Sequence, residues 1–547
     1  MRGNVRGILT ALAAGVLCGR SAAGSGLSLI PEKTFFMQGA PVDMRVTLSG
    51  AGDLTGKRLR LTILSESGRE AGTRDVAPLV FVNAVRFEGL PCGKYTVRTE
   101  LFADRAVTRG LGDVARTPNA EVTGEVREER SEAWIRIIPQ PERKSRARIR
   151  DGVLFADDEP FLMLSTGLTL SFEERKRSAA EQRRLLDERL AELAEHGFNL
   201  VCPGDLVFSG DYLAYPDIAE IYGKTAGWGV RERVALMPHD RVGYSEFIAL
   251  AKKHGLFVKG WVSPVTRTRE LTPRQIEIWS DLVLKYRNEE NILFWKTEDE
   301  TDTWPEHNAL LYRLFKEIDP ARPVKLVVIN AVQPNLGAAD IHSTDPYPIG
   351  DGNSIGAVAY HCDRLKRLTG GNPGQCFVLW LQMYGHKHEK KICPTPRQLR
   401  AMAFLALNHG AKGLLYHTYQ PKGQRNKNDW ELTDELFAST KTLHAQIRTL
   451  SAPYLLGKAL PDASADNPAV DVAAREHGGV VYVIAVNTSM RPLPLVRITL
   501  PGGKWPKQAD QLFDNRQADI RGGTIEAALN VNDVRVYAIR PAGEGQK

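Results

Sequence analysis

Four carboxylates stand within five residues at the end of an apolar run, in the segment ILFWKTEDETD. They are Glu298, Asp299, Glu300 and Asp302. A run of buried-strand type cannot carry so many like charges into an apolar core, because unpaired buried carboxylates are strongly disfavoured. Some of these side chains must therefore face water or a working site. Carboxyl groups at a strand end suit general acid/base chemistry, in which one group holds a proton near neutral pH.

Short apolar runs alternate with amphipathic helical patterns around this segment, between residues 149 and 456. Eight strand candidates, all but one followed by a clear helical pattern, predict a parallel sheet with right-handed crossovers. Eight such units over about 300 residues fit a (β/α)8 barrel, and no glycine-rich nucleotide motif follows the first strand. The predicted strands lie in 161–168, 198–206, 256–264, 292–300, 324–330, 338–349, 376–385 and 413–420.

Two β-patterned segments flank the predicted barrel. Residues 27–140 alternate apolar and polar side chains in short runs between turn residues, which predicts an immunoglobulin-like β-sandwich. Within it, FEGLPCGKYTVRTELF (87–102) is interpreted as the last hairpin of that sandwich. The basic tract PERKSRARIR (141–150) is interpreted as a solvated linker, and residues 459–541 predict a small antiparallel β domain.

The first 23 residues have the layout of a secretory signal. Two arginines precede an apolar run over residues 8–17, and small residues at 21–23 form a candidate cleavage site. We therefore expect export to the periplasm or the extracellular space. The run is too short to span a bilayer, so no membrane span is expected. A lipid anchor on Cys18 is disfavoured, because Leu17 stands where such a signal has a small residue.

The net charge and the cysteine content exclude some classes of function for this chain. The net charge of +7 falls to +4 when the three arginines of the signal are removed. So small a positive charge on a large chain does not indicate a basic surface that binds nucleic acid. The five cysteines beyond the signal are scattered, odd in number and without zinc spacing, so we expect neither a disulfide framework nor a cofactor. They are Cys92, Cys202, Cys362, Cys376 and Cys393.

Barrel enzymes carry their chemistry at the carboxyl ends of the strands. In this chain those ends hold carboxylates, histidines, a glutamine and large aromatic residues. Flat rings suit the apolar faces of sugars, and polar side chains suit their hydroxyl groups, so a carbohydrate is the expected substrate. The candidate substrate-binding residues are Asp205, Trp261, His342, Tyr347, Gln382, Tyr384, His417 and Tyr419.

The barrel segment resembles the retaining glycoside hydrolases of the large (β/α)8 superfamily. The resemblance is closest to a bacterial subset with W-x-x-x-D-E-P-[DE] at strand four, D-x-Y-P at strand six and a long motif from helix seven into strand eight. This chain has WKTEDETD, DPYP and PTPRQLRAMAFLALNHGAKG, with Thr301 where the subset has proline. Trp295 and the pair Asp299 and Glu300 match the strand-four motif. The resemblance implies a glycoside hydrolase with Glu300 as general acid/base.

Strand alternation predicts Glu298 and Glu300 on one face and Asp299 on the other. Glu298 would then crowd Glu300, and a like charge nearby raises the pKa of a carboxyl group, as a proton donor requires. Glu298 is therefore a further catalytic candidate. The alternative is that these groups are loop carboxylates paired with Lys296 or with arginines.

The second catalytic carboxylate is left open. By the resemblance it would be a glutamate at the end of strand seven, where this chain has Gln382. Glu389 follows seven residues later, so Asp345 on strand six is the remaining candidate. Its alternative role is to hold Tyr347 and the strand-six turn. A separation of about 5–5.5 Å between the carboxyl groups would indicate retention, and about 6.5–9.5 Å would indicate inversion.

The sequence leaves three further alternatives. His386 and His388 stand beside Glu389 and could share a metal, but no third ligand is evident, so no metal site is expected. Gln382 favours a second interpretation, a catalytically inactive barrel that binds carbohydrate. A lyase or transferase on the same barrel is a third.

Overall fold

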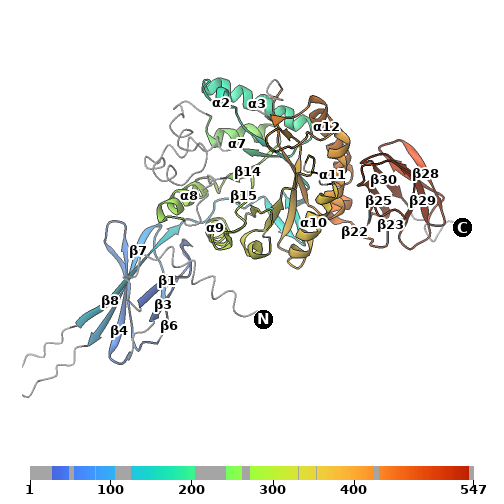
Figure 1. The fold of residues 1–547 in the computed structure, drawn as a ribbon. Coiled ribbons are helices and arrows are strands. Elements are labelled where there is room, and N and C mark those ends of the chain that lie inside the picture. Colours follow the sequence, from blue (N-terminus) through green and yellow to red (C-terminus); the bar gives the residue numbers. More distant parts are fainter. Residues whose placement is uncertain are drawn as a thin grey trace, which may run out of the picture. The chain divides into compact units, whose positions relative to one another are not determined.

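The computed structural model describes residues 27–48, 54–80, 82–104, 125–203, 242–261, 271–330, 332–350, 352, 354–422, 425 and 430–540. These residues fall into two compact units. The first contains the N-terminal β domain with helix α8 and the C-terminal part of α9. The second contains the barrel strands and the C-terminal β domain (Figure 1). The predicted signal, residues 1–23, lies outside the described residues.

Eight parallel strands form a closed barrel in the second unit. Each strand pairs with the next in chain order, and the last pairs with the first through Met163 opposite Gly413. This confirms the predicted (β/α)8 fold class. The strands are β12 (Met163–Leu168), β13 (Leu200–Pro203), β14 (Phe257–Trp261), β15 (Ile292–Asp299), β16 (Val324–Val327), β17 (Ile341–Thr344), β18 (Cys376–Gln382) and β20 (Gly413–His417).

Local sequence explains where several helices begin. The tetrapeptide TPRQ occurs twice, and each time its threonine and glutamine form a reciprocal capping box with proline in the first turn. Between β16 and β17 the described residues form only the 3-10 helix η1. The helices are α2 (Phe172–Arg175), α3 (Ala179–Glu195), α7 (Tyr244–Lys253), α8 (Pro273–Tyr286), α9 (Pro305–Ile318), η1 (Gln333–Ala338), α10 (Gly356–Thr369), α11 (Pro396–Asn408), α12 (Asp434–Thr449) and α13 (Ser451–Leu456).

The amino end of the barrel is filled by apolar side chains. Met163, Leu200 and Phe294 pack there with Leu154, which belongs to a three-stranded sheet preceding the barrel. This packing leaves the carboxyl ends of the strands as the open end of the barrel. The small sheet consists of β9 (Ala147–Arg150), β10 (Val153–Ala156) and β11 (Glu159–Pro160).

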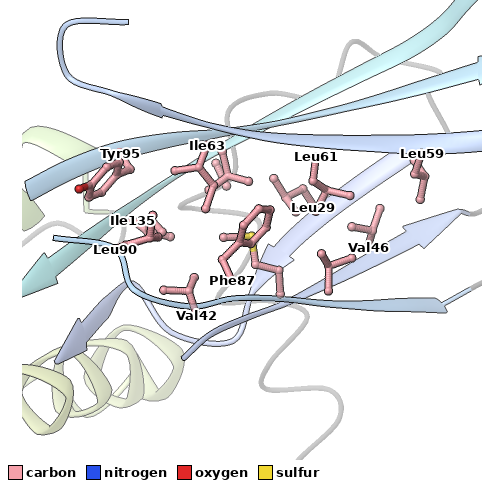
Figure 2. Close-up of a cluster of buried hydrophobic side chains, with 14 of the residues drawn as sticks. Leu29, Val42, Val46, Leu59, Leu61, Ile63, Phe87, Leu90, Tyr95 and Ile135 are labelled. Atoms are coloured by element: carbon pink, nitrogen blue, oxygen red, sulfur yellow. The ribbon is translucent and has the colours of Figure 1, made fainter. Parts of the chain in front are cut away.

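The N-terminal domain consists of two sheets whose alternate side chains share one apolar core (Figure 2). Leu29 and Phe87 from one sheet and Leu61 and Ile135 from the other contribute to it. The predicted last hairpin is wrong: its two strands belong to different sheets, and a further strand follows them. One sheet contains β1 (Leu27–Pro31), β3 (Val42–Leu48) and β6 (Val82–Phe87); the other contains β2 (Phe35–Met37), β8 (Glu125–Ile138), β7 (Gly93–Asp104), β4 (Lys57–Ser65) and β5 (Glu70–Val76).

The C-terminal domain is antiparallel, as predicted, and packs on helix α11. His409, at the end of that helix, lies 2.7 Å from both Asp363 and Asp471, and Asp471 belongs to the domain. No helix among the described residues is long and apolar enough to cross a lipid bilayer. The strands are β22 (Lys458–Ala459), β23 (Ser464–Ala465), β24 (Val470–His477), β25 (Val480–Asn487), β26 (Leu493–Thr499), β27 (Gln508–Leu512), β28 (Arg516–Arg521), β29 (Thr524–Leu529) and β30 (Val534–Ile539).

Candidate active site

A β-bulge at the end of β15 determines which acidic side chains reach the open end of the barrel. Lys296 pairs with Lys325 and Asp299 pairs with Val327, so three steps along β15 oppose two along β16. Glu300 follows in the left-handed region with φ of 56°, and its amide donates to the carbonyl of Val327 at 3.1 Å. The bulge and the left-handed conformation of Glu300 interrupt the regular alternation of side chains along the strand. Asp299 and Glu300 therefore both line the cavity at the strand ends.

Glu298 lies outside that cavity, contrary to the prediction that it shares a face with Glu300. Its side chain is buried, and its Oε1 lies 3.3 Å from Nε2 of His307 on α9. Asp302 accepts a hydrogen bond from the amide of Ile329 at 2.8 Å. The four clustered carboxylates are thus divided between two that line a cavity and two that bind neighbouring protein groups.

The cavity at the carboxyl ends of the strands has a volume of about 510 Å³. Groups from most of the barrel strands and from the loops after β18 and β20 line it. Its lining combines carboxylates, lysines, one histidine and aromatic rings. The charged and aromatic residues are Asp299, Glu300, Asp345, Glu389, Lys259, Lys296, Lys391, His417, Tyr347, Trp380, Tyr384 and Trp430.

Glu300 and Asp345 face each other across this cavity wall, from the ends of β15 and β17. Their carboxyl groups form a side-chain hydrogen bond. Burial, the hydrogen bond and the charge of Glu300 raise the pKa of Asp345 to about 8. Asp345 therefore retains its proton at neutral pH, in contact with the carboxyl group of Glu300. Direct contact is closer than the separation of either the retaining or the inverting arrangement.

Asp299 is the counterpart that remains ionised. Burial alone would raise its pKa, but the charges of Lys296, Lys325 and Lys259 lower the pKa to about 2. The Nζ of Lys296 lies 2.9 Å from its Oδ1. The cavity therefore presents a carboxylate that is charged at neutral pH beside a carboxyl pair that retains a proton.

Aromatic rings form one wall of the cavity. Tyr347 stacks on His417 with ring centroids 5.7 Å apart, and Tyr384 packs edge-on against both rings. Trp430, from the short strand β21 (Trp430–Glu431), lies 4.9 Å from the ring of Tyr384. Burial lowers the pKa of His417 to about 4, so its imidazole is neutral at neutral pH. Three predicted substrate-binding residues, Tyr347, Tyr384 and His417, are thus brought together.

Gln382, His342 and Tyr419 do not line the cavity, and these placements correct the predictions for them. The Gln382 side chain is fully buried and makes four hydrogen bonds to main-chain groups. His342 lies on the outward face of β17, beside Leu326 in the register. The Tyr419 hydroxyl donates to Glu192 on α3. All three side chains bind protein groups or pack behind the strands.

Two further predicted residues cannot be placed. Asp205 lies outside the described residues, and β14 ends at Trp261, whose side chain the structure does not describe. The suggested metal pair is also absent from the cavity wall: His386 Nδ1 lies 3.5 Å from Glu389, and its ring packs on Trp430. Within the described ranges, no group of three His, Cys, Asp or Glu side chains could hold a metal, and the five cysteines are free.

The sequence patterns did not predict Lys259 or Lys325 near the site, and Lys296 was expected only as an alternative partner of the clustered carboxylates. Lys259, Lys296 and Lys325 each stand within an otherwise apolar strand, in FVKGW, ILFWKTED and VKLV. That repetition on three successive strands was the available signal, because a lone lysine in a buried strand needs a counter-charge. Trp430 lies in the short strand β21, and no local pattern marks it.

These features define a (β/α)8 barrel with an acidic and aromatic cavity at the carboxyl ends of its strands. No family model matches the chain, and no curated protein matches it. Solved structures with a similar fold include an FMN-binding beta-glucuronidase from Facaelibacterium prausnitzii, with 10% identity, a TM-score of 0.36 and coverage of 95% of this chain and 70% of that one.

A noncanonic maltogenic alpha-amylase from Thermotoga neapolitana is 12% identical, with a TM-score of 0.48 and coverage of 69% and 99%. AmyP in complex with maltose is also 12% identical, with a TM-score of 0.43 and coverage of 70% and 93%. The similarity of this chain to these glycoside hydrolases concerns the fold.

Proposed function

We propose that this chain is a glycoside hydrolase that cleaves O-glycosidic bonds of an oligo- or polysaccharide by carboxyl-group acid catalysis. The observation that carries the proposal is the hydrogen-bonded pair Glu300 and Asp345 at the ends of two barrel strands. A group that retains its proton near pH 7 can protonate a leaving alcohol, which an ordinary ionised carboxylate cannot.

The proposed reaction uses the proton of this pair. As the bond between the anomeric carbon and the glycosidic oxygen breaks, the proton moves from the pair to that oxygen. The positive charge that develops on the sugar is stabilised by a nearby carboxylate. Water then adds to the anomeric carbon, and its proton returns to the pair. Both saccharide products leave with complete hydroxyl groups.

Asp299 is the first candidate for the stabilising carboxylate, because its lysine neighbours keep it ionised. Glu389 is the second; it lines the same cavity, and its Oε2 lies 3.4 Å from the hydroxyl of Tyr384. Gln382 is unsuitable, since its amide is engaged by main-chain groups. The aromatic wall supports the substrate class, because rings pack on the apolar faces of sugars.

Hydrolysis of a panel of glycans and aryl glycosides tests this proposal. The mature chain is expected to release reducing sugar from at least one substrate, and Glu300→Gln is expected to lower kcat by about 10²–10⁴-fold. Glu306→Gln makes the same chemical change at an exposed position of α9 and should leave kcat unchanged. Equal activity of the wild-type and Glu300→Gln chains would contradict the proposal.

A second candidate function is carbohydrate binding without catalysis. Gln382 favours this alternative. In the hydrolases that the chain resembles, the end of strand seven carries the nucleophile; here the Gln382 side chain at that position is hydrogen-bonded to main-chain groups of a loop. This alternative predicts saturable binding of a glycan with no turnover, and with little effect of Glu300→Gln on affinity. Calorimetry alongside the hydrolysis assay separates the two functions.

We also propose that the protein acts outside the cytoplasm. The support is the order of arginines, apolar run and small residues in the first 23 positions. Expression of the full chain should yield a mature species that starts after residue 23 in the exported fraction. An unprocessed chain retained with the cytoplasmic fraction would contradict export.

A further inference from the structure

Three neighbouring barrel strands each direct one lysine into the barrel interior. Lys259, Lys296 and Lys325 come from β14, β15 and β16, and we refer to them as the lysine cluster. Lys296 and Lys325 are paired in the register, so their side chains leave the sheet on the same face. Lys259 and Lys296 line the cavity. Lys325 lies one layer deeper, since Val327, two residues further along its strand, also lines the cavity.

Two buried donors in this region have no hydrogen-bond acceptor among the described residues. One is the Nζ of Lys325, whose side chain is fully buried with its ammonium 5.4 Å from the ring centroid of Trp380. The other is the Oγ of Ser343, also fully buried, on the neighbouring strand β17. Buried polar groups without partners are costly, and a buried cation more so, unless a ligand satisfies them.

Among the described residues, the three lysines face two negatively charged carboxylates, Asp299 and Glu300. Asp299 is the carboxylate that interacts with all three lysines. Asp345 also faces Lys325, but its raised pKa keeps it protonated, so the negative charge of this pair comes from Glu300 alone. Burial and the charge of Lys296 lower the pKa of Lys325 to about 7, which is the response of an ammonium group short of anions. An added anion would relieve this excess of positive charge.

We propose that the lysine cluster and Ser343 bind an anionic substituent of the saccharide, a carboxylate or a sulfate, so that the substrate is an acidic glycan. This inference rests on the proposed function of the same cavity. The aromatic wall would hold the sugar ring while Lys259, Lys296 and Lys325 hold the anion. A cavity lined by one sign of charge with low-dielectric walls attracts ligands of the opposite sign.

A purely electrostatic role for the lysines is the competing explanation. In it, the lysine cluster serves only to keep Asp299 ionised. That role requires no anion in the ligand, so it predicts equal affinity for acidic and neutral saccharides of the same length. The two explanations therefore differ in a quantity that is measurable without turnover.

Calorimetric binding to the full-length mature chain tests the inference, with three probes: a galacturonate oligomer, a sulfated galactose oligomer and a neutral galactose oligomer of equal length. The wild type should bind one acidic probe at least about tenfold more tightly than the neutral one. Preference for galacturonate assigns a carboxylate, and preference for the sulfated oligomer assigns a sulfate. Equal affinity for all three probes would overturn the inference.

Lys325→Met removes the charge while keeping most of the volume of the side chain, so the fold should tolerate it. It should lower affinity for the preferred acidic probe about tenfold or more and leave affinity for the neutral probe unchanged. Ser343→Ala should act in the same direction more weakly. Lys412→Met removes a largely buried lysine beyond the cavity and is the matched control. Equal loss for acidic and neutral probes in Lys325→Met would overturn the inference.

Failure of the proposed function is distinguishable from failure of this inference. An acidic preference without hydrolysis of any glycan would retain the anion site and reject the hydrolase. Hydrolysis of neutral glycans with no acidic preference would retain the hydrolase and reject the anion site. If Lys325→Met does not fold, the wild-type preference together with Ser343→Ala decides the question.

Discussion

The ends of β15 and β18 show how differently two equivalent positions of one barrel can be used. Both strands finish at the carboxyl edge, where the resemblance to glycoside hydrolases implies catalytic carboxylates. At β15 a bulge turns Asp299 and Glu300 toward the cavity. At β18 the strand runs regularly into Gln382, whose amide is bound by main-chain groups on neighbouring loops. A side chain at a strand end is available to bind or react with a ligand only where it is not already hydrogen-bonded within the protein.

The largest expected effect concerns the β15 end. Glu300→Gln and Asp345→Asn should each lower kcat about 10²–10⁴-fold, because each removes one member of a pair that shares a proton. The double variant should lose little more than the worse single variant, since groups that act as a unit are strongly non-additive. Steady-state kinetics of the three variants measures this. Multiplicative losses would show that the two carboxyl groups act independently.

The next effect concerns the β18 end and should appear in stability. Gln382→Glu replaces a donor of three hydrogen bonds with a carboxylate facing three carbonyl oxygens. We expect it to lower the free energy of unfolding by about 3–5 kcal/mol, measured by chemical denaturation. Gln398→Glu is the matched control, because a glutamate at that half-buried position can still accept from Thr395 in the capping box. Unchanged stability of Gln382→Glu would mean that Gln382 is not committed to the fold.

A smaller effect concerns the pH dependence of activity, which should change in Asp345→Asn but not in variants at the end of β18. Since the proton donor must be protonated, activity should hold below the Asp345 pKa of about 8 and fall about tenfold per pH unit above it. A profile of kcat/KM against pH measures this limb. Asp345→Asn should remove the limb, whereas Gln382 variants that fold should keep it. Persistence of the limb in Asp345→Asn would assign it to another group, such as Lys325.

The smallest effect concerns the backbone of the bulge. Glu300 has a φ of 56°, where glycine is favoured over residues with a Cβ. Glu300→Gly should therefore be more stable than Glu300→Ala by about 1 kcal/mol in chemical denaturation. At Gln382, within a regular strand, the order should reverse, because glycine weakens strand interiors. If the glycine variant were the more stable one at both positions, or at neither, the proposed difference in backbone conformation between the two strand ends would be contradicted.

Local sequence patterns were sufficient for the architecture. Alternating apolar runs and helical periodicities predicted the barrel, and both flanking β domains followed from period-two runs. Capping motifs such as TPRQ show why: a helix start depends on residues three apart, whose side chains and amides meet without help from the rest of the fold. The sandwich hairpin was wrong because the choice of sheet for each strand depends on distant partners.

The candidate site divides in the same way. The sequence by itself determined which strands end in acidic, aromatic and basic residues, and hence that Glu300, Asp345, Tyr347, Tyr384 and His417 belong to one rim. Only the tertiary structure decided which of these rim side chains face the cavity. The bulge that turns Glu298 away depends on the register with β16, and the burial of Gln382 depends on loops that close over it. The physical reason is that hydrogen bonds to partners distant in sequence outweigh local alternation.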